Sequence, residues 1–293
     1  MLILIQILSR LPLTVLYAIA DYLIYPLMYW VVRYRRDVVA KNLRLSFPDK
    51  TAQELLQIEK DFYHHFANTI VEIIYGYRIS DEEMRERMQF DNVDEVEQAI
   101  LQSGGVFYML GHIGNWEWMA DMGKRYTHPD ITEYNVYRKQ KNNSIDQAML
   151  AIRAKRGGGC IEKNALVRQI ISLNKAKQMF SLGLISDQKP TPVNAHFWTT
   201  FLHQETSFLI GGETLAKKFN YPLYYAHMRR TQRGYYRVRF IPLSMSPSNT
   251  APYEITQAFA TALENNIIEQ PELWLWTHNR WKYPRPQQTQ QTT

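Results

Sequence analysis

The sequence predicts an α/β fold, a mixed sheet flanked by helices, preceded by an N-terminal membrane-associated helix. Three observations support this prediction. Beyond residue 100, short runs rich in β-branched and aromatic residues alternate with helical segments. After Thr51, apolar residues recur at helical spacing. The first 34 residues contain the longest apolar stretch in the chain. Strands that alternate with helices are typical of a sheet covered by helices.

The N-terminal stretch from Leu11 to Val32 carries one charge and is long enough to cross a bilayer. It has neither a basic region before it nor a small-residue cleavage site after it, so we expect it to be retained. Polar side chains recur every three or four residues and should form one helical stripe able to pack on a globular domain: Gln6, Arg10, Thr14, Tyr17 and Asp21. Pro12 and Pro26 should bend the helix.

Basic residues follow this stretch directly: Arg33, Arg35, Arg36, Lys41 and Arg44. Such a cluster predicts that its side of the membrane is cytoplasmic and that it attracts anionic lipid. The net charge of +6 favours anionic partners such as phospholipid head groups, phosphorylated substrates or an acidic carrier protein, and charge alone equally allows nucleic acid. The single cysteine, Cys160, excludes an internal disulfide and a Cys-x-x-Cys pair, which fits a reducing compartment.

The chain divides into an N-terminal membrane helix over residues 1–34, an α/β domain over residues 35–283 and a tail over residues 284–293 that we expect to be disordered. A capping box, Thr51 with Glu54, marks the start of one helix, and another should start near Ser80. The β-rich runs predict five strands, at Val106–Leu110, Thr132–Tyr137, Met179–Ile185, Leu223–Met228 and Tyr235–Ile241. The last two should form a hairpin around Gly234.

The segment Gly111-His112-Ile113-Gly114-Asn115-Trp116-Glu117 follows the first of these strands and leads into a helix. Ligands of α/β sheets bind at such strand ends. A histidine there can take a proton from a hydroxyl, while a nearby carboxylate fixes its tautomer and stabilises the imidazolium. The sequence therefore predicts His112 as a general base and Glu117 as its acidic partner, with His112 placed before the helix that carries Glu117.

The same spacing occurs at His128 and Glu133, where Pro129 and Asp130 indicate a turn instead of a strand end. The glycine-rich stretch at Gly157–Cys160 lacks the ending of a phosphate loop and is interpreted as a flexible turn. No Gly-x-Ser-x-Gly elbow and no His-Glu-x-x-His motif occur in the sequence, which disfavours a serine hydrolase and a zinc protease.

Several further motifs accompany the histidine segment, and together they make the chain resemble the late lipid A biosynthesis acyltransferase family over most of its length. The matches are Arg36-x5-Asn42-Leu-x3-Phe47-Pro48, Val136-Tyr137-Arg138, Ser186-Asp187-Gln188 and Trp276-Thr277-His278-Asn279-Arg280-Trp281. Where relatives usually have an aromatic-rich turn after the Asp-Gln segment, this chain has Phe201-Leu202-His203-Gln204.

The resemblance implies an acyltransferase that moves a fatty acyl chain from an acyl carrier protein or coenzyme A thioester to a hydroxyl of a lipid A precursor or related glycolipid. It implies His112 and Glu117 as the catalytic pair and Arg138 as the group that stabilises the oxyanion. Asn115, Asp187, Gln188 and Arg280 are expected to bind substrate. No metal or other cofactor is expected, and the membrane, not nucleic acid, is the expected partner. The expected location is the cytoplasmic face of a bacterial inner membrane.

Two alternatives stay open at this point. The same chemistry could act on a lysophospholipid or an aminolipid. Alternatively, the chain could be a non-catalytic membrane scaffold that binds anionic lipid through its basic residues.

Overall fold

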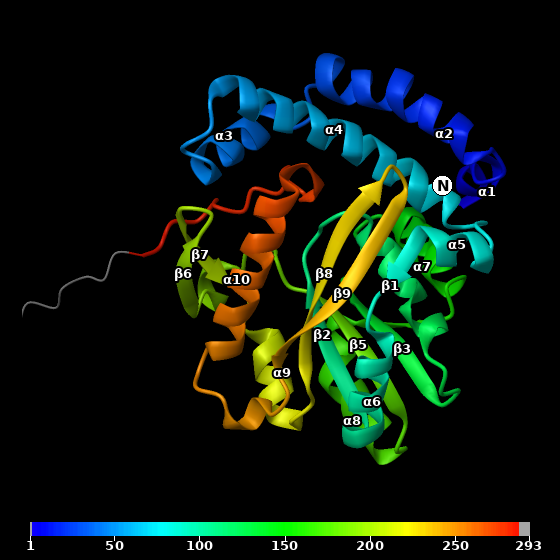
Figure 1. The fold of residues 1–293 in the computed structure, drawn as a ribbon, viewed down its shortest axis with the longest axis vertical. Helices are drawn as coiled ribbons and strands as arrows, with labels where there is room; N and C mark the ends of the chain where they lie inside the picture. Colours follow the sequence, from blue (N-terminus) through cyan, green and yellow to red (C-terminus); the bar gives the residue numbers. More distant parts are fainter. Residues whose placement is uncertain (1, 287–293) are drawn as a thin grey trace, which may run out of the picture.

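The computed structural model describes residues 2–286 and confirms the predicted α/β fold. Within these residues, seven strands form one mixed sheet in the order β1-β9-β8-β2-β5-β3-β4 (Figure 1). The strands are β1 (Met88–Phe90), β2 (Gly105–Leu110), β3 (Ile131–Tyr137), β4 (Gly159–Glu162), β5 (Met179–Ile185), β8 (Leu223–Gln232) and β9 (Tyr235–Ser244). A separate antiparallel hairpin consists of β6 (Phe197–Phe201) and β7 (Gln204–Phe208).

All five predicted strands are present, and β8 and β9 run several residues further than the sequence pattern indicated. These two strands form the predicted hairpin, with Gly234 in the left-handed region at φ 74°. Strands β1 and β4 were not predicted, because runs of 3 and 4 residues are too short to show a period. The hairpin of β6 and β7 was also not predicted, and its turn is the Leu202-His203 pair.

The long helices are α3 (Arg36–Ser46), α4 (Ala52–Tyr75), α6 (Val93–Ser103), α7 (Asn143–Ala154), α8 (Leu166–Lys175), α9 (Gly211–Phe219) and α10 (Glu254–Glu269). Shorter ones are α1 (Leu2–Leu8), α2 (Leu13–Ile19), α5 (Asp81–Arg87), the π-helical turns η1 (Ala20–Ile24) and η2 (Leu27–Val31), and the 3₁₀ helices η3 (Trp116–Arg125), η4 (Lys163–Ala165), η5 (Pro192–Asn194), η6 (Pro247–Asn249) and η7 (Pro271–Leu273). The predicted capping box is formed: Glu54 N donates to Thr51 Oγ1, and Thr51 N donates to the Glu54 carboxylate.

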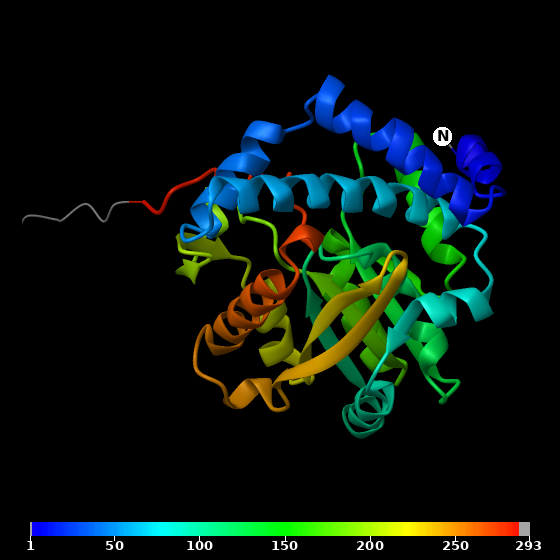
Figure 2. The ribbon, with the colours of Figure 1, turned by 45° about the horizontal axis from the view of Figure 1, so that its top comes forward.

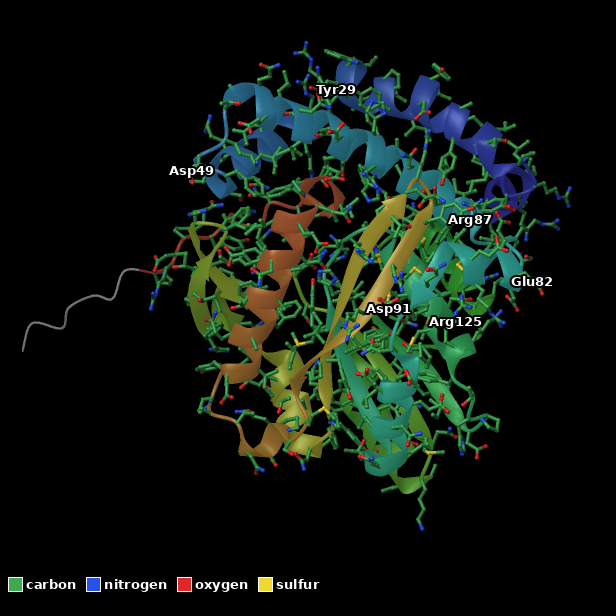
Figure 3. The ribbon with its side chains drawn as sticks, in the orientation of Figure 1. Tyr29, Asp49, Glu82, Arg87, Asp91 and Arg125 are labelled. Carbon is green, nitrogen blue, oxygen red and sulfur yellow. The ribbon has the colours of Figure 1, made fainter. Side chains whose placement is uncertain are left out.

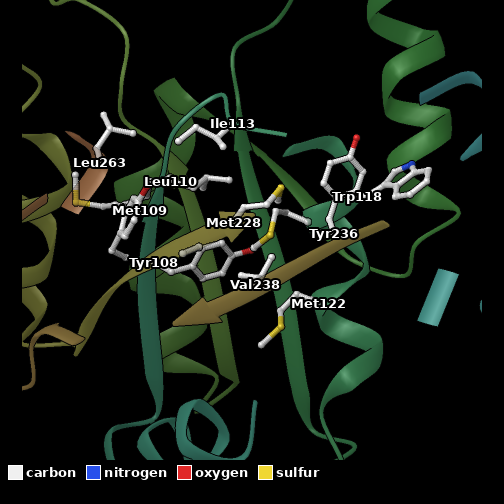
Figure 4. Packing of buried hydrophobic residues seen from close by; sticks show 14 of the residues in the cluster. Tyr108, Met109, Leu110, Ile113, Trp118, Met122, Met228, Tyr236, Val238 and Leu263 are labelled. Atoms are coloured by element: carbon white, nitrogen blue, oxygen red, sulfur yellow. The ribbon is translucent and has the colours of Figure 1, made fainter. Parts of the chain in front are cut away.

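The core lies on both sides of β2, whose six residues are all buried. Figure 4 shows Tyr108 of β2 near Val238 of β9, and Tyr236 of β9 beside Trp118 of η3. The sequence of a strand that is buried on both faces is a continuous apolar run, as it is at Val106–Leu110. Strand β2 is therefore a rigid support for the residues that follow its carboxyl end.

The N-terminal helices lie against α4, which crosses above the carboxyl end of β2 (Figures 1 and 2). One helical rod, Leu13–Val31, has 19 residues and is long and apolar enough to cross a membrane. Tyr29, labelled in Figure 3, is fully buried at the far end of this rod, where its ring meets Tyr63 of α4 edge-on with centroids 5.3 Å apart. Residues 287–293, most of the tail expected to be disordered, lie outside the described residues.

Candidate active site

The turn after β2 is held by two backbone hydrogen bonds to the segment Leu273–Leu275. His112 O accepts a hydrogen bond from Leu275 N at 3.1 Å, and Gly114 N donates to Leu273 O at 3.1 Å. Two glycines shape this turn. Gly114 has φ 60°, and a Cβ on Gly111 would lie 2.6 Å from a methyl carbon of Leu263. The turn therefore presents His112 in one fixed orientation at the end of the strand.

Asp187 is the carboxylate that contacts His112. Its Oδ1 lies 2.6 Å from His112 Nδ1, and its Oδ2 accepts the backbone N–H of His112 at 2.8 Å. Trp274 Nε1 donates to the same Oδ2 at 2.9 Å. This geometry assigns the Nδ1–H tautomer, which leaves the Nε2 lone pair free to accept a proton.

Strand order brings this pair together. Strands β2 and β5 are parallel neighbours, and the last residue of β2, Leu110, is in register with Ile185 at the end of β5. His112 and Asp187 each follow two residues after these partners. Two positions 75 residues apart in sequence thus meet at the same edge of the sheet.

The pKa values of the pair move apart. Burial lowers the pKa of His112, but the charge of Asp187, its hydrogen bond and the more remote charge of Glu117 outweigh this, so the net pKa is raised. Burial raises the pKa of Asp187, whereas the facing imidazole and the hydrogen bonds from His112 and Trp274 bring it to about 2. The carboxylate stays ionised and makes the imidazole a stronger base.

Glu117, the expected orienting partner, makes a different contact. Its two oxygens accept hydrogen bonds from Arg153 Nε and a terminal nitrogen of Arg153, at 2.8 and 2.7 Å. Among residues 2–286, no hydrogen bond joins Glu117 to His112. The Glu117 carboxylate thus binds Arg153 of α7, and its expected role as the acidic partner of His112 stays a prediction.

Arg138 lies at the end of β3, as the sequence predicts, and its side chain is exposed. It shares a small pocket of about 110 Å³ with Glu117 and Arg153. Apolar side chains of α7 complete the wall, namely Ile145, Met149 and Leu150. The pocket thus combines two cations and two carboxylates, Glu117 and Asp146, with an apolar side, which suits a polar group attached to an alkyl chain.

Arg153 was not singled out from the sequence, although a signal was present. Asp146, Met149, Leu150 and Arg153 follow each other at helical spacing, so they occupy one face of α7. Nothing in the sequence alone showed that this face points toward Glu117.

Gln188 lies beside the free nitrogen of His112, with its side-chain nitrogen 3.4 Å from Nε2. The side chain is exposed, and the Trp116 ring meets the imidazole edge-on with centroids 5.0 Å apart. Gln188 is therefore placed where a group approaching Nε2 would meet it, and its expected role in substrate binding stays a prediction.

Asn115 and Arg280, both expected to bind substrate, are buried instead. Asn115 is fully buried and donates from Nδ2 to Glu72 Oε2 at 3.0 Å. Arg280 is 2% exposed, donates to the carbonyl of Ser207 and lies over the Phe208 ring at 4.7 Å, and burial lowers its pKa to about 10. Neither side chain is exposed in this structure: Asn115 anchors the turn and Arg280 anchors the β6–β7 hairpin, and their expected roles in substrate binding stay predictions.

The two terminal motifs form one contact. Asn42 Nδ2 donates to the carbonyls of Trp276 and His278 at 3.0 and 3.1 Å, and Arg35 donates to Thr277 O at 2.9 Å. Burial lowers the pKa of His278 to about 4, so this imidazole is neutral at physiological pH. The Arg36–Pro48 motif thus supports the segment that in turn holds the His112 turn.

No group of three or more His, Cys, Asp or Glu side chains that could hold a metal ion occurs in the described part of the chain.

The model of the bacterial lipid A biosynthesis acyltransferase family matches residues 1–283. The chain belongs to this family. It is therefore an acyltransferase, with a lipid as acceptor, and the resemblance predicted from the motifs is confirmed. The lipid A biosynthesis palmitoleoyltransferase of Escherichia coli (strain K12) is 22% identical over 249 residues, which cover 85% of this chain and 79% of that protein. The lipid A biosynthesis acyltransferase of Shigella flexneri gives the same identity and coverage.

Membership of the lipid A acyltransferase family gives the site its reaction class, and the geometry gives the roles available to each side chain. An acyl transfer to a hydroxyl needs a base for the hydroxyl proton and a positive group for the developing oxyanion. In this chain His112 has a free basic nitrogen, and Arg138 and Arg153 are the cations of the neighbouring pocket.

Proposed function

We propose that this enzyme transfers a fatty acyl chain from a carrier-protein or coenzyme A thioester to a hydroxyl of a lipid A precursor, with His112 as general base. The observation that carries the proposal is the bonded pair of His112 and Asp187 at the end of β2, with Nε2 unprotonated and facing the exposed side chain of Gln188. Family membership supplies the acyl transfer, and this pair supplies the base that the transfer requires.

The proposed reaction has the following steps. Nε2 of His112 takes the proton of the acceptor hydroxyl while that oxygen forms a bond to the thioester carbonyl carbon. Asp187 stabilises the imidazolium that results. The tetrahedral intermediate then collapses, the carbon–sulfur bond breaks, and the imidazolium returns the proton to the leaving thiolate. The products are an ester and a free thiol, and no covalent enzyme intermediate forms.

The pocket beside the histidine supports a role for Arg138 in stabilising the oxyanion. Its side chain is exposed at the surface of a pocket whose other cation, Arg153, pairs with Glu117. Glu117 in this account keeps Arg153 in place and adds to the basicity of His112. The exposed basic residues after Val32 support a location on the cytoplasmic face of the inner membrane.

The acceptor and the acyl chain can be identified by mass spectrometry of membrane lipids. Cells that lack this enzyme would be compared with cells that express either the wild type or His112→Ala. We expect one lipid A species to gain the mass of one acyl chain with the wild type only. A gain on a lysophospholipid or aminolipid would contradict the proposed acceptor. No gain on any lipid would contradict acyl transfer itself and favour the scaffold alternative.

Replacement of Arg138 by Ala should lower kcat by roughly a hundredfold or more and leave the acceptor KM nearly unchanged, because an oxyanion exists only in the transition state. Arg138→Lys should recover part of the loss, since an ammonium keeps the charge but not the planar fork. Steady-state kinetics at two ionic strengths measure this.

Lys139→Ala is the matched control, because Lys139 is the next exposed cation along the chain. It should leave kcat unchanged. If Arg138→Ala instead raises KM at constant kcat and high salt reproduces the change, Arg138 binds an anionic group and has no part in the chemical step.

A further inference from the structure

The polar stripe of the N-terminal helices faces the protein. Gln6 donates to the Tyr77 hydroxyl at 3.0 Å, and the Tyr17 hydroxyl donates to Glu72 at 2.9 Å. Asp21 accepts two hydrogen bonds from Arg233, in the turn between β8 and β9, at 2.7 and 2.8 Å. Three of the five residues of the predicted stripe thus bind the globular domain, in agreement with the sequence pattern.

The bond from Tyr17 completes a buried site. Glu72 is fully buried, and its carboxylate accepts from Tyr17, Asn115 and Tyr236 at 2.8–3.0 Å. Burial raises the pKa of Glu72, while these hydrogen bonds lower it. Loss of one of these donors would leave a buried carboxylate oxygen without a hydrogen bond, and this would strongly destabilise the folded protein. The helix is therefore an integral part of the domain, and through Asn115 the same carboxylate holds the turn that bears His112.

The contact with α4 extends along most of the apolar rod. Tyr17 meets Glu72, the Tyr25 ring stacks on His64 with centroids 3.5 Å apart, and Tyr29 meets Tyr63. The rod and α4 run side by side in both views (Figures 1 and 2). Near the middle of the rod, Asp21 is joined to Arg233 of the sheet hairpin.

This arrangement conflicts with a helix that crosses the bilayer. A crossing rod would place its midpoint, and with it the Asp21–Arg233 pair and the hairpin tip, at the centre of the hydrocarbon. Lys60 and Asp61 of α4 would be drawn into the membrane as well. Charged groups are expensive there, and the irregular backbone of a turn does not occur facing lipid.

The opposite face of the rod is apolar and exposed. Tyr22 is 85% exposed, Val31 73% and Trp30 57%. Other large apolar side chains on the outer side of the N-terminal helices are Ile3, Leu4, Ile7, Val15, Leu23, Leu27 and Val32. Exposed cations lie at both ends of the apolar stretch, Arg10 before it and Arg33 with Arg35 after it. Apolar side chains flanked by aromatic rings and cations match the boundary between acyl chains and anionic head groups.

We propose that residues 2–34 form a docking surface for an anionic phospholipid bilayer and lie in the plane of one leaflet, without crossing it. The apolar face enters the boundary between head groups and acyl chains, and the polar stripe stays bound to α4 and the β8–β9 turn. Both ends of the helix then remain on the side of the membrane that holds the catalytic domain. This proposal concerns only how residues 2–34 lie relative to the bilayer, and it does not depend on which lipid accepts the acyl chain.

Two labelling measurements on the full chain test it, in a Cys160→Ser background that removes the only cysteine. The first uses a membrane-impermeant maleimide on inverted vesicles and on spheroplasts. Single cysteines at Arg10 and Arg33 mark the two ends of the apolar stretch, and Ser248→Cys, an exposed position on the globular domain, marks the domain side. We expect all three to react from the same side. Reaction of Arg10→Cys only from the side opposite to Ser248→Cys would overturn the proposal.

The second measurement gives the depth of the rod's midpoint. A fluorophore on Tyr22→Cys is read in vesicles of phosphatidylglycerol and phosphatidylethanolamine that carry quenchers at a shallow or a deep acyl position. An in-plane helix should show several-fold stronger quenching by the shallow quencher. Stronger quenching by the deep one places the midpoint at the bilayer centre and contradicts the proposal. Trp30→Cys is the matched control, because it lies near the boundary in either topology. Neither readout depends on activity, so this proposal and the proposed function can fail separately.

Discussion

His112→Ala should lose nearly all acyl transfer while it remains folded. Loss of a general base costs roughly a hundredfold to ten-thousandfold in rate, and the contact with Asp187 leaves Nε2 as the basic nitrogen of this imidazole. The imidazole is largely buried at the end of β2, but the turn keeps its backbone contacts to Leu273 and Leu275 in the variant. Turnover of a thioester donor with the acceptor lipid measures the loss of activity, and circular dichroism measures whether the variant remains folded.

His128→Ala is the matched control, because His128 precedes Glu133 at the same spacing as His112 precedes Glu117. Its ring accepts the backbone N–H of Asp130 at 3.3 Å. Near wild-type turnover is expected. A loss in His128→Ala as large as that in His112→Ala would show that the wrong histidine has been chosen as the base.

Asp187→Asn should lower kcat by roughly a thousandfold to ten-thousandfold, as loss of the carboxylate behind a catalytic histidine does in serine proteases. The amide can present its NH₂ to Nδ1 and so favour the wrong tautomer. The acid limb of the pH profile of kcat/KM should also move. Asp187 raises the pKa of His112, so its removal lowers that pKa, and the limb shifts to lower pH.

Glu117→Gln distinguishes the effect of Glu117 on the pKa of His112 from that of Asp187. It keeps the size of the side chain and removes only the remote charge, so it should shift the acid limb in the same direction but by less than Asp187→Asn. Measurement of kcat/KM against pH for both variants gives the comparison. A larger shift in Glu117→Gln would restore Glu117 as the direct partner of His112 and contradict the assignment to Asp187.

The sequence by itself determined the local features of this protein. The capping box at Thr51, the buried strand at Val106–Leu110, the turn at Gly234 and the polar stripe from Gln6 to Asp21 were all predicted and are all present. Each of them depends on residues within a few positions of one another, where spacing and side-chain type decide the backbone conformation. The motif segments that identify the family are local as well, and they located His112 at the end of its strand.

Only the tertiary structure decided which side chains meet. The sequence placed both Glu117 and Asp187 near a strand end, but the neighbouring positions of β2 and β5 in the sheet bring Asp187 onto His112. The pairing of Glu117 with Arg153 depends in turn on where α7 packs. Asn115 was predicted as a substrate contact, and its burial against Glu72 comes from α4 crossing the sheet. Strand order and helix placement are set by packing of the whole core, which no short window of sequence contains.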